Sequence, residues 1–162
     1  MKIISKENIY NADDVKITRL DILAPHIAKA ARAGQFVALM AHEDGERIPL
    51  TIVDTDTSKG TITLIFQEVG LTTKFLGKLN VGDSLYAIVG PLGHATEIKN
   101  YGKIILVGGG VGIAEILPVA RAFKAAGNEV TTILGARTKS LLILEKELKE
   151  ASDTLFITTD DG

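Results

Sequence analysis

Short apolar runs separated by turn residues fill the first half of the chain. Six of these runs have the β-branched composition and the flanking turn residues of strands: Lys2–Ile9, Val15–Leu23, Phe36–Met40, Ile48–Val53, Thr61–Glu68 and Asp83–Val89. One helix-like segment interrupts them. Short strands at this spacing predict a small antiparallel barrel or sandwich, and the glycines and proline of Gly90–Gly93 mark its expected end.

The second half of the chain alternates between strand and helix patterns. The expected elements are a strand at 104–107, a helix at 113–126, a strand at 129–134, a helix at 140–151 and a strand at 154–158. Leu141, Leu144, Leu148 and Ala151 supply the apolar stripe of the second helix. This β-α-β-α-β order predicts the first half of a doubly wound parallel nucleotide-binding fold. We therefore expect the chain to be a fragment of a longer polypeptide.

The sharpest local feature is the passage from the apolar run Ile104–Val107 into the four glycines of Gly108–Gly112. A glycine turn between a buried strand and a helix lets the backbone approach a phosphate closely. The strict G-x-G-x-x-G/A spacing is not met, because counting from Gly108 places Ile113 at the last position. A close-packed turn of any α/β protein therefore remains an alternative at this point.

Two further segments in the first half carry candidate anion-binding groups. Arg47–Asp54 combines an arginine, a proline and a hydroxyl at the start of a strand, which suits an anionic group and a flat heterocycle. Gly70–Leu76 places two threonine hydroxyls at a helix start. The alternatives are an edge strand with a surface arginine and an ordinary threonine helix cap.

Net charge, the length of the apolar runs and the absence of cysteine exclude several classes of function and site. The 162 residues carry a net charge of −2, which argues against a nucleic-acid partner. No apolar run approaches the ~20 residues that span a bilayer, and the start lacks a signal-peptide core, so we expect a cytoplasmic protein without a membrane partner. The chain has no cysteine, and its three histidines lack ligand spacing, so no metal site is assigned.

In chain order, the three candidate segments resemble the motifs of ferredoxin–NADP reductase-like flavoproteins. Arg47-Ile48-Pro49-Leu50-Thr51 is similar to the flavin motif Arg-x-Pro-(Leu/Ile)-(Ser/Thr), and Gly70-x-Thr72-Thr73 to the second flavin element. Gly108–Ala114 resembles the Gly-Gly-Gly-x-Gly-x-Ala nicotinamide-nucleotide turn. Gly90–Gly93, Gly135–Arg137 and Thr159–Gly162 are most similar to a branch of electron-transfer subunits. That branch includes the small subunit of NADH-dependent ferredoxin:NADP oxidoreductase (sulfide dehydrogenase) and the dihydroorotate dehydrogenase electron-transfer subunit.

The resemblance implies a six-stranded Greek-key FAD-binding barrel at 1–98 and a partial NAD(P)-binding domain at 99–162. It assigns Arg47, Pro49, Leu50 and Thr51 to the isoalloxazine and ribityl chain, and Ile65, Phe66 and Gln67 to the flavin's flank. Gly70, Thr72 and Thr73 would take the pyrophosphate, and Gly109, Gly110, Val111 and Gly112 the nicotinamide dinucleotide. Arg137 follows the second strand, where ribose or 2′-phosphate recognition usually sits, and Asp160 and Asp161 would line the cleft. For these last three residues, a solvated loop position is the alternative.

The implied function is that of an FAD-dependent NAD(P)H oxidoreductase subunit that passes electrons toward ferredoxin or a larger catalytic or flavoprotein subunit. Members of the branch carry a C-terminal cysteine cluster for a [2Fe–2S] centre, which we expect in a segment missing here. Hydride transfer itself needs no protein acid or base, so no catalytic residue is assigned. The alternatives are a dihydroorotate dehydrogenase electron-transfer subunit, a non-catalytic nucleotide-binding module and a plain interaction domain.

Overall fold

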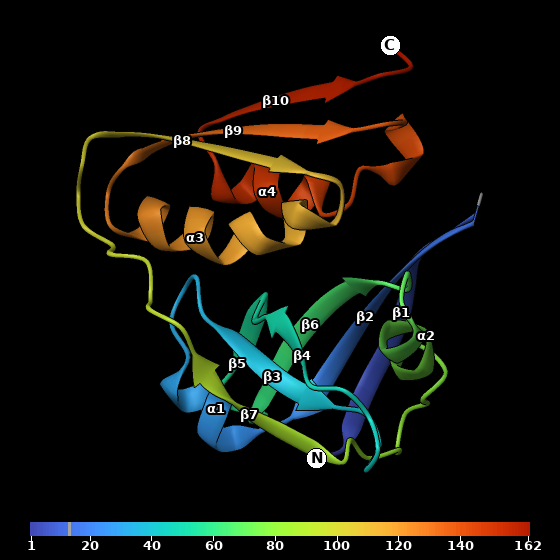
Figure 1. The fold of residues 1–162 in the computed structure, drawn as a ribbon. Coiled ribbons are helices and arrows are strands. Elements are labelled where there is room, and N and C mark those ends of the chain that lie inside the picture. The colour runs from blue at the N-terminus through green and yellow to red at the C-terminus, as the bar shows by residue number, and fades with distance from the viewer. Residues whose placement is uncertain (13) are drawn as a thin grey trace. The chain divides into compact units, whose positions relative to one another are not determined.

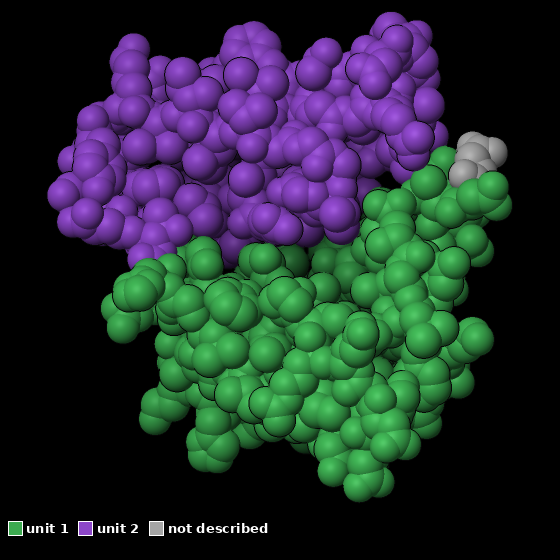
Figure 2. Space-filling view, viewed as in Figure 1, with its two compact units in different colours: residues 1–94 green, residues 95–162 purple. Residues whose placement is uncertain are grey.

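A computed structural model of the chain describes residues 1–12 and 14–162 and divides them into two compact units, 1–94 and 95–162 (Figure 2). The sequence-based boundary between residues 98 and 99 falls in a segment without helix or strand, four residues after the end of the first unit. The first unit contains antiparallel strands with two short helices, and the second contains parallel strands with two longer helices (Figure 1).

The first unit is built from two antiparallel sheets. One has the order β1 (Ile3–Ala12), β2 (Val15–Leu23), β6 (Thr61–Gln67) and β5 (Asp54–Asp56), and the other has the order β4 (Ile48–Thr51), β3 (Phe36–Met40) and β7 (Ala87–Leu92). Helix α1 (Pro25–Ala30) follows β2, and α2 (Leu71–Leu76) follows β6. Their inward side chains form one core, with Leu20, Ile22, Val37, Leu39, Ile62 and Leu64 among its most buried members.

Two connections join the sheets into a barrel. An antiparallel bridge pairs Lys2 with Ser84, and the Ile3 amide donates to the Asp83 carbonyl at 2.8 Å. At the other side, the chain passes from β4 to β5 through the buried residues Ile52 and Val53. β3 pairs with the next strand, β4, and β5, which continues the chain from β4, pairs with β6. The last strand of the unit, β7, returns to pair with β3. This is Greek-key order, so the predicted barrel is confirmed.

Two strand predictions need correction. Ile48–Val53 is not one strand, because the chain bends after Thr51 and continues in the other sheet as β5, which gives seven strands in the described residues of the first unit. The last strand lies at Ala87–Leu92 instead of Asp83–Val89, so it runs through the expected break. Its register shifts by one residue between Phe36↔Leu92 and Ala38↔Val89, and this bulge accommodates Gly90 and Pro91.

The second unit is a three-stranded parallel sheet in the order β10 (Thr154–Thr159), β9 (Glu129–Ala136), β8 (Lys103–Gly109). A 3₁₀ turn at Gly110–Gly112 leads into α3 (Ile113–Ala125), and α4 (Glu145–Ala151) precedes β10. Helix α3 includes Pro118 as its sixth residue, inside the helix, where a proline has no amide hydrogen to donate to the carbonyl four residues earlier. The predicted β-α-β-α-β order is confirmed.

The second helix is shorter than the apolar periodicity predicted. Residues Lys139–Leu141 form a separate 3₁₀ turn, and Leu144 adopts a left-handed conformation with φ of 57° immediately before α4. Leu141 and Leu144 therefore do not belong to the helix stripe, which is carried by Leu148 and Ala151. Ile143, which the periodicity did not select, is buried beside them.

One face of this sheet carries large exposed apolar side chains. Figure 1 shows α3 and α4 on the same side of β8, β9 and β10. On the opposite face Val107, Ile133 and Phe156 lie in one row across the strands, and Val107 and Phe156 are 68% and 57% exposed. None of the helices in the described part of the chain has the length and apolar character needed to cross a membrane.

Candidate functional site

The first candidate segment forms the edge strand β4 and the residue before it. β4 pairs with β3 through Leu39↔Ile48, Ala38↔Pro49 and Phe36↔Thr51. Strand alternation packs Ile48 and Leu50 against the barrel core and turns Pro49 and Thr51 to the other side. Proline suits this edge position because it has no amide to donate. The exposed Arg47 donates from Nε to the Sδ atom of Met40 at 3.3 Å, a weak acceptor.

The residues at the end of β6 that were predicted to lie beside the flavin point to opposite faces of the strand. Phe66 is 2% exposed and belongs to the barrel core, whereas Ile65 points to the opposite side of the strand and is also buried. Gln67 is half-buried at the end of the ladder with β2. The Phe66 side chain therefore cannot face a ligand outside the barrel, and only the backbone there is available for that role.

The second candidate segment caps α2. The Gly70 amide donates to Thr73 Oγ1 at 3.0 Å, and the Thr73 hydroxyl donates to the Gly70 carbonyl at 3.1 Å. Amides of the first helical turn, including that of Thr72, have no acceptor within the helix. Leu76 is fully buried and anchors α2 to the core.

An aromatic contact ties these two segments together. The rings of His42, in the loop that leads to Arg47, and Phe75, in α2, meet edge-on with their centroids 4.6 Å apart. β4 also packs beside β6, the strand that leads into Gly70. The first unit thus brings the predicted isoalloxazine and pyrophosphate segments onto neighbouring elements.

In the second unit the glycines between β8 and α3 have two different roles: Gly108 is closely packed, whereas Gly110 and Gly112 have open space around them. A Cβ on Gly108 would lie 2.7 Å from Ile116 Cδ1, so this glycine allows α3 to pack closely on β8. Gly110 has a φ of 56°, which favours glycine, and a Cβ on Gly110 or Gly112 would meet no atom within 4 Å. The turn that begins at Gly109 and includes Val111 therefore presents accessible backbone at the start of α3.

The parallel register brings the remaining predicted residues to the same edge of the sheet. β8, β9 and β10 end at Gly109, Ala136 and Thr159, and Arg137 and Asp160 follow directly. The Asp160 amide donates to the Ala136 carbonyl at 3.3 Å. Arg137, Asp160 and Asp161 are exposed. They lie beyond the carboxyl ends of the strands, where open α/β sheets bind ligands.

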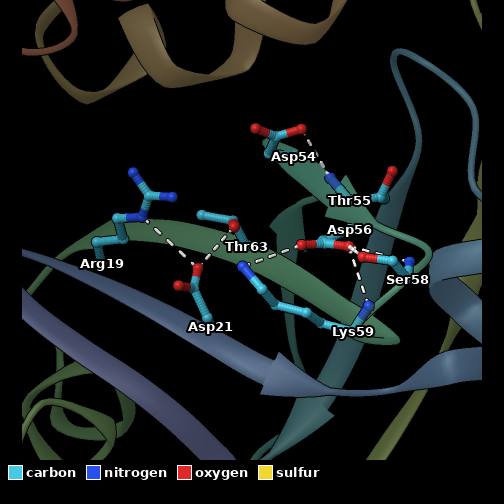
Figure 3. Close-up of polar contacts among 8 residues, drawn as sticks. All are labelled: Arg19, Asp21, Asp54, Thr55, Asp56, Ser58, Lys59 and Thr63. Carbon is cyan, nitrogen blue, oxygen red and sulfur yellow. Dashed lines mark hydrogen bonds and ion pairs between the residues drawn. The ribbon is translucent and has the colours of Figure 1, made fainter.

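The structure also assembles polar groups that sequence analysis did not single out. On the sheet that contains β2, β6 and β5, Figure 3 shows Asp21 accepting from the Thr63 hydroxyl at 2.6 Å and facing Arg19 Nε at 3.6 Å. Asp56 accepts from the Ser58 hydroxyl at 2.6 Å, and Lys59 Nζ lies 3.2 Å from its carboxylate. All of these residues except Ser58 line a pocket of 480 Å³.

Hydrogen bonding makes Asp56 the most perturbed acid of this group. The Ser58 hydroxyl, followed by the Lys59 amide and ammonium, holds the pKa of the Asp56 carboxyl well below its ordinary value of 3.8. Among the described residues, no group of three or more His, Cys, Asp or Glu side chains could hold a metal ion. The cluster is therefore a network of paired charges.

A second pocket, of 520 Å³, lies beside α2. Lys16, Glu68, Lys74 and Lys78 contribute charged groups to its lining. Lys16 and Glu68 come from β2 and from the residue after β6, and their side chains pair at 3.1 Å. Sequence analysis missed this pairing because only the antiparallel register between β2 and β6 brings the two residues together.

The chain matches one known domain family over the full range of its first unit and the first two residues of the second. The model of the oxidoreductase FAD-binding domain matches residues 1–96. That range contains both segments predicted to hold the flavin.

Three similar proteins extend over nearly the whole chain. A dihydroorotate dehydrogenase B (NAD(+)) electron transfer subunit homolog from Thermotoga maritima is 52% identical over 87% of this chain and 50% of the relative. The dihydroorotate dehydrogenase B (NAD(+)) electron transfer subunit of Streptococcus pneumoniae is 34% identical over 100% of this chain and 62% of the relative. The structure of an NADH-dependent reduced ferredoxin-NADP oxidoreductase, studied for flavin-based electron bifurcation, matches with a TM-score of 0.92 and 44% identity over 99% of this chain and 57% of its own.

A more distant structure supports the fold alone. Ferredoxin-NADP+ reductase from Plasmodium falciparum superposes with a TM-score of 0.77 at 16% identity, over 98% of this chain and 68% of its own. The chain thus spans 50% to 62% of the length of the two curated relatives described above.

Proposed function

This chain belongs to the oxidoreductase FAD-binding domain family, and on that premise we propose that it is the flavin- and nicotinamide-binding part of an electron-transfer subunit. In this role it takes electrons from NAD(P)H onto FAD and delivers them to a partner. The observation that carries the proposal is the link between the Arg47–Thr51 and Gly70–Thr73 segments through the His42–Phe75 contact. The family match covers both of these segments.

Residues of the first unit would hold FAD. The exposed Arg47, together with Pro49 and Thr51, which face away from the core, would line the isoalloxazine ring and ribityl chain, and Leu50 would contribute there through its backbone because its side chain packs against the core. Gly70, Thr72 and Thr73 receive the pyrophosphate with backbone amides and hydroxyls. Ile65, Phe66 and Gln67 contribute to the flank, Phe66 through its backbone only because its side chain is in the core.

Residues of the second unit would hold the nicotinamide dinucleotide. The space around Gly109, Gly110 and Gly112 would be filled by larger side chains, which supports close approach of a phosphate to this turn. Val111 continues the turn, and the helix that starts at Ile113 adds first-turn amides. Arg137 supplies a cation for the ribose end, and Asp160 and Asp161 border the same edge.

When bound, FAD supplies the redox chemistry that converts a two-electron hydride into single-electron transfers. The chain's own contribution is to bind and orient, so we assign no acid or base. A [2Fe–2S] cluster would be held outside these 162 residues, since they contain no cysteine. The partner would be a larger catalytic or flavoprotein subunit, with ferredoxin as the further acceptor. A cytoplasmic location stays a prediction.

Anaerobic reduction tests the proposal. Protein reconstituted with FAD should be yellow, and NADH or NADPH should bleach its visible absorption. Flavin binding without bleaching would favour a non-catalytic nucleotide-binding module, and no binding of either nucleotide would favour an interaction domain. Because the chain spans about half to two thirds of its relatives, the same test is applied to a version extended to their full length.

A second candidate is the electron-transfer subunit of a dihydroorotate dehydrogenase. The 52% and 34% identities to proteins of that name favour it, whereas the TM-score of 0.92 favours the ferredoxin-dependent enzyme. Electron acceptors separate the two candidates. With the cognate partner subunit present, NADH-dependent electron transfer between ferredoxin and NADP+ supports the first function, and reduction of NAD+ to NADH by dihydroorotate supports the second.

A further inference from the structure

Two residues before the flavin phosphate segment Gly70–Thr73 lies an acid, Glu68, whose side chain is buried and held from β2. The Glu68 side chain is 8% exposed, and its Oε1 atom accepts from the fully buried Thr18 hydroxyl at 2.6 Å. Lys16 Nζ lies 3.1 Å from the same oxygen, and the Glu68 amide donates to the Lys16 carbonyl at 2.8 Å. Backbone and side chain therefore fix Glu68 to the same strand.

The Glu68 carboxylate also lies against the C-terminal end of α2. Gly77 follows the last residue of α2 and is buried, and a Cβ at Gly77 would overlap the Glu68 carboxylate. Its φ of −68° does not require glycine, but a side chain there would conflict with the Glu68 carboxylate and would have to displace it from Thr18 and Lys16. The acid thus packs directly against the backbone at the C-terminal end of the helix.

A lysine from β1 contacts the same end. Lys6 Nζ donates to the carbonyl oxygens of Gly77 and Leu79 at 2.5 and 2.7 Å. An ammonium at the C-terminal carbonyls of a helix satisfies acceptors that lack intrahelical donors and favours the helix dipole. Lys6 and Glu68 therefore hold the end of α2 from two sides, and both are fixed by the β1–β2–β6 sheet.

We infer that Lys6 and Glu68 are positioning residues that set the placement of the Gly70–Thr73 segment for the flavin phosphates. The inference rests on the proposed function, because it concerns the segment assigned there to the pyrophosphate. A helix of six residues is too short to be stable alone, so tertiary contacts determine its position. Such a helix spans about 9 Å and moves as a unit, so displacement of its C-terminal end also displaces Gly70 and Thr73.

Substitution of Lys6 provides the test. Lys6→Met removes the ammonium but keeps the aliphatic stem, and Lys6→Arg restores donors to the two carbonyls. Lys2→Met is the matched control, because Lys2 is an exposed lysine beside the start of β1. Glu68→Gln is the milder second variant, which keeps an acceptor for Thr18 but loses the charge paired with Lys16. FAD affinity, the Tm of the apoprotein, the visible spectrum and the phosphorus NMR of bound FAD are measured for each.

We expect Lys6→Met to weaken FAD binding about tenfold, with Glu68→Gln in the same direction and Lys6→Arg close to wild type. The phosphorus resonances of bound FAD should move while the visible spectrum of the ring stays unchanged, and Lys2→Met should match wild type throughout. If Lys6→Met does not fold, Glu68→Gln alone decides the matter by the same readouts.

Unchanged FAD affinity in Lys6→Met and Glu68→Gln would overturn the inference while leaving the proposed function intact. Equal changes in the phosphorus and visible spectra, or failure of Lys6→Arg to restore affinity, would also overturn it, because the effect would then be a general loss of structure. A wild-type protein that fails to bind FAD would instead contradict the proposed function.

Discussion

The ring of His42 packs edge-on against the ring of Phe75, with their centroids 4.6 Å apart. His42 belongs to the loop before Arg47, and Phe75 belongs to the helix capped by Gly70. One contact between side chains therefore connects the two segments that we assign to the isoalloxazine and the pyrophosphate. The arrangement makes the flavin site a property of the folded barrel and not of either segment alone.

Removing this contact should weaken flavin binding more than it weakens the fold. Phe75 is 37% exposed, so Phe75→Ala loses an aromatic contact of about 0.5–1.5 kcal/mol together with part of its burial. We expect FAD affinity to fall about threefold to tenfold in a fluorescence titration. Val81→Ala, which also truncates an exposed apolar side chain, is the control and should bind like wild type. Equal affinities for the two variants would contradict the role assigned to the contact.

Two glycines of the nicotinamide turn should respond oppositely to alanine. Gly108→Ala places a methyl group against Ile116 and should lower the free energy of unfolding by about 1–3 kcal/mol in denaturant titrations. Gly112 has a φ of −62° and open space around it, so Gly112→Ala should leave stability unchanged or slightly raised. It should nevertheless weaken NADH binding about tenfold, because the methyl group occupies the space assigned to the phosphate. The idea fails if Gly112→Ala binds NADH as tightly as wild type.

The Asp56 network predicts a specific pH dependence of stability. Hydrogen bonds lower the pKa of Asp56 in the folded protein below its ordinary value of 3.8, so its charge stabilises the folded state above that pH. This contribution is lost as the pH falls through and below 3.8, because the unfolded state then binds more protons than the folded state.

Asp56→Asn removes the charge and keeps an acceptor. We expect a small loss of stability near neutral pH, since the carboxylate is exposed to solvent, and a difference from wild type that shrinks in acid. Thermal melts across the acid range measure it. Asp44→Asn, which removes the charge of an exposed aspartate in the β3–β4 loop, is the matched control. A difference in Tm between wild type and Asp56→Asn that grows as the pH falls would contradict this prediction.

The uncovered face of the second sheet should bind hydrophobic probes. Val107 and Phe156 flank Ile133 of β9 in one row across the sheet, and both are more than half exposed. Replacing both with threonine keeps β-propensity and removes apolar area. We expect weaker fluorescence of a hydrophobic dye and higher solubility at an unchanged Tm. Dye binding that is as strong in the double variant as in wild type would show that this face is not the apolar surface responsible.

Local sequence patterns were sufficient where one element determines the outcome. The apolar run Ile104–Val107 followed by glycines predicted β8, its turn and α3, because strand length, glycine flexibility and helical periodicity are all local. The Arg47–Thr51 and Gly70–Thr73 segments were likewise found from residue type and order. Their connection through His42 and Phe75 was not, since two residues 33 positions apart carry no local signal of contact.

Contacts between elements distant in sequence determined the features that sequence analysis did not predict. Thr61–Gln67 is buried on both faces, so its pattern could not reveal that Phe66 points into the core while Ile65 points away. The periodicity that predicted a helix from residue 140 continued through Leu144, whose left-handed backbone delays the start of α4. The contacts of Lys6 and Glu68 with Gly77 depend on strand pairing, which composition does not encode.

Titration of the apoprotein with FAD tests the central claim most directly. The account predicts saturable binding at one site per chain, monitored by quenching of flavin fluorescence, and a clear loss of affinity in the double variant Arg47→Ala, Thr51→Ala without a matching loss of Tm. Absence of saturable FAD binding, or equal affinity in wild type and the double variant, would contradict it.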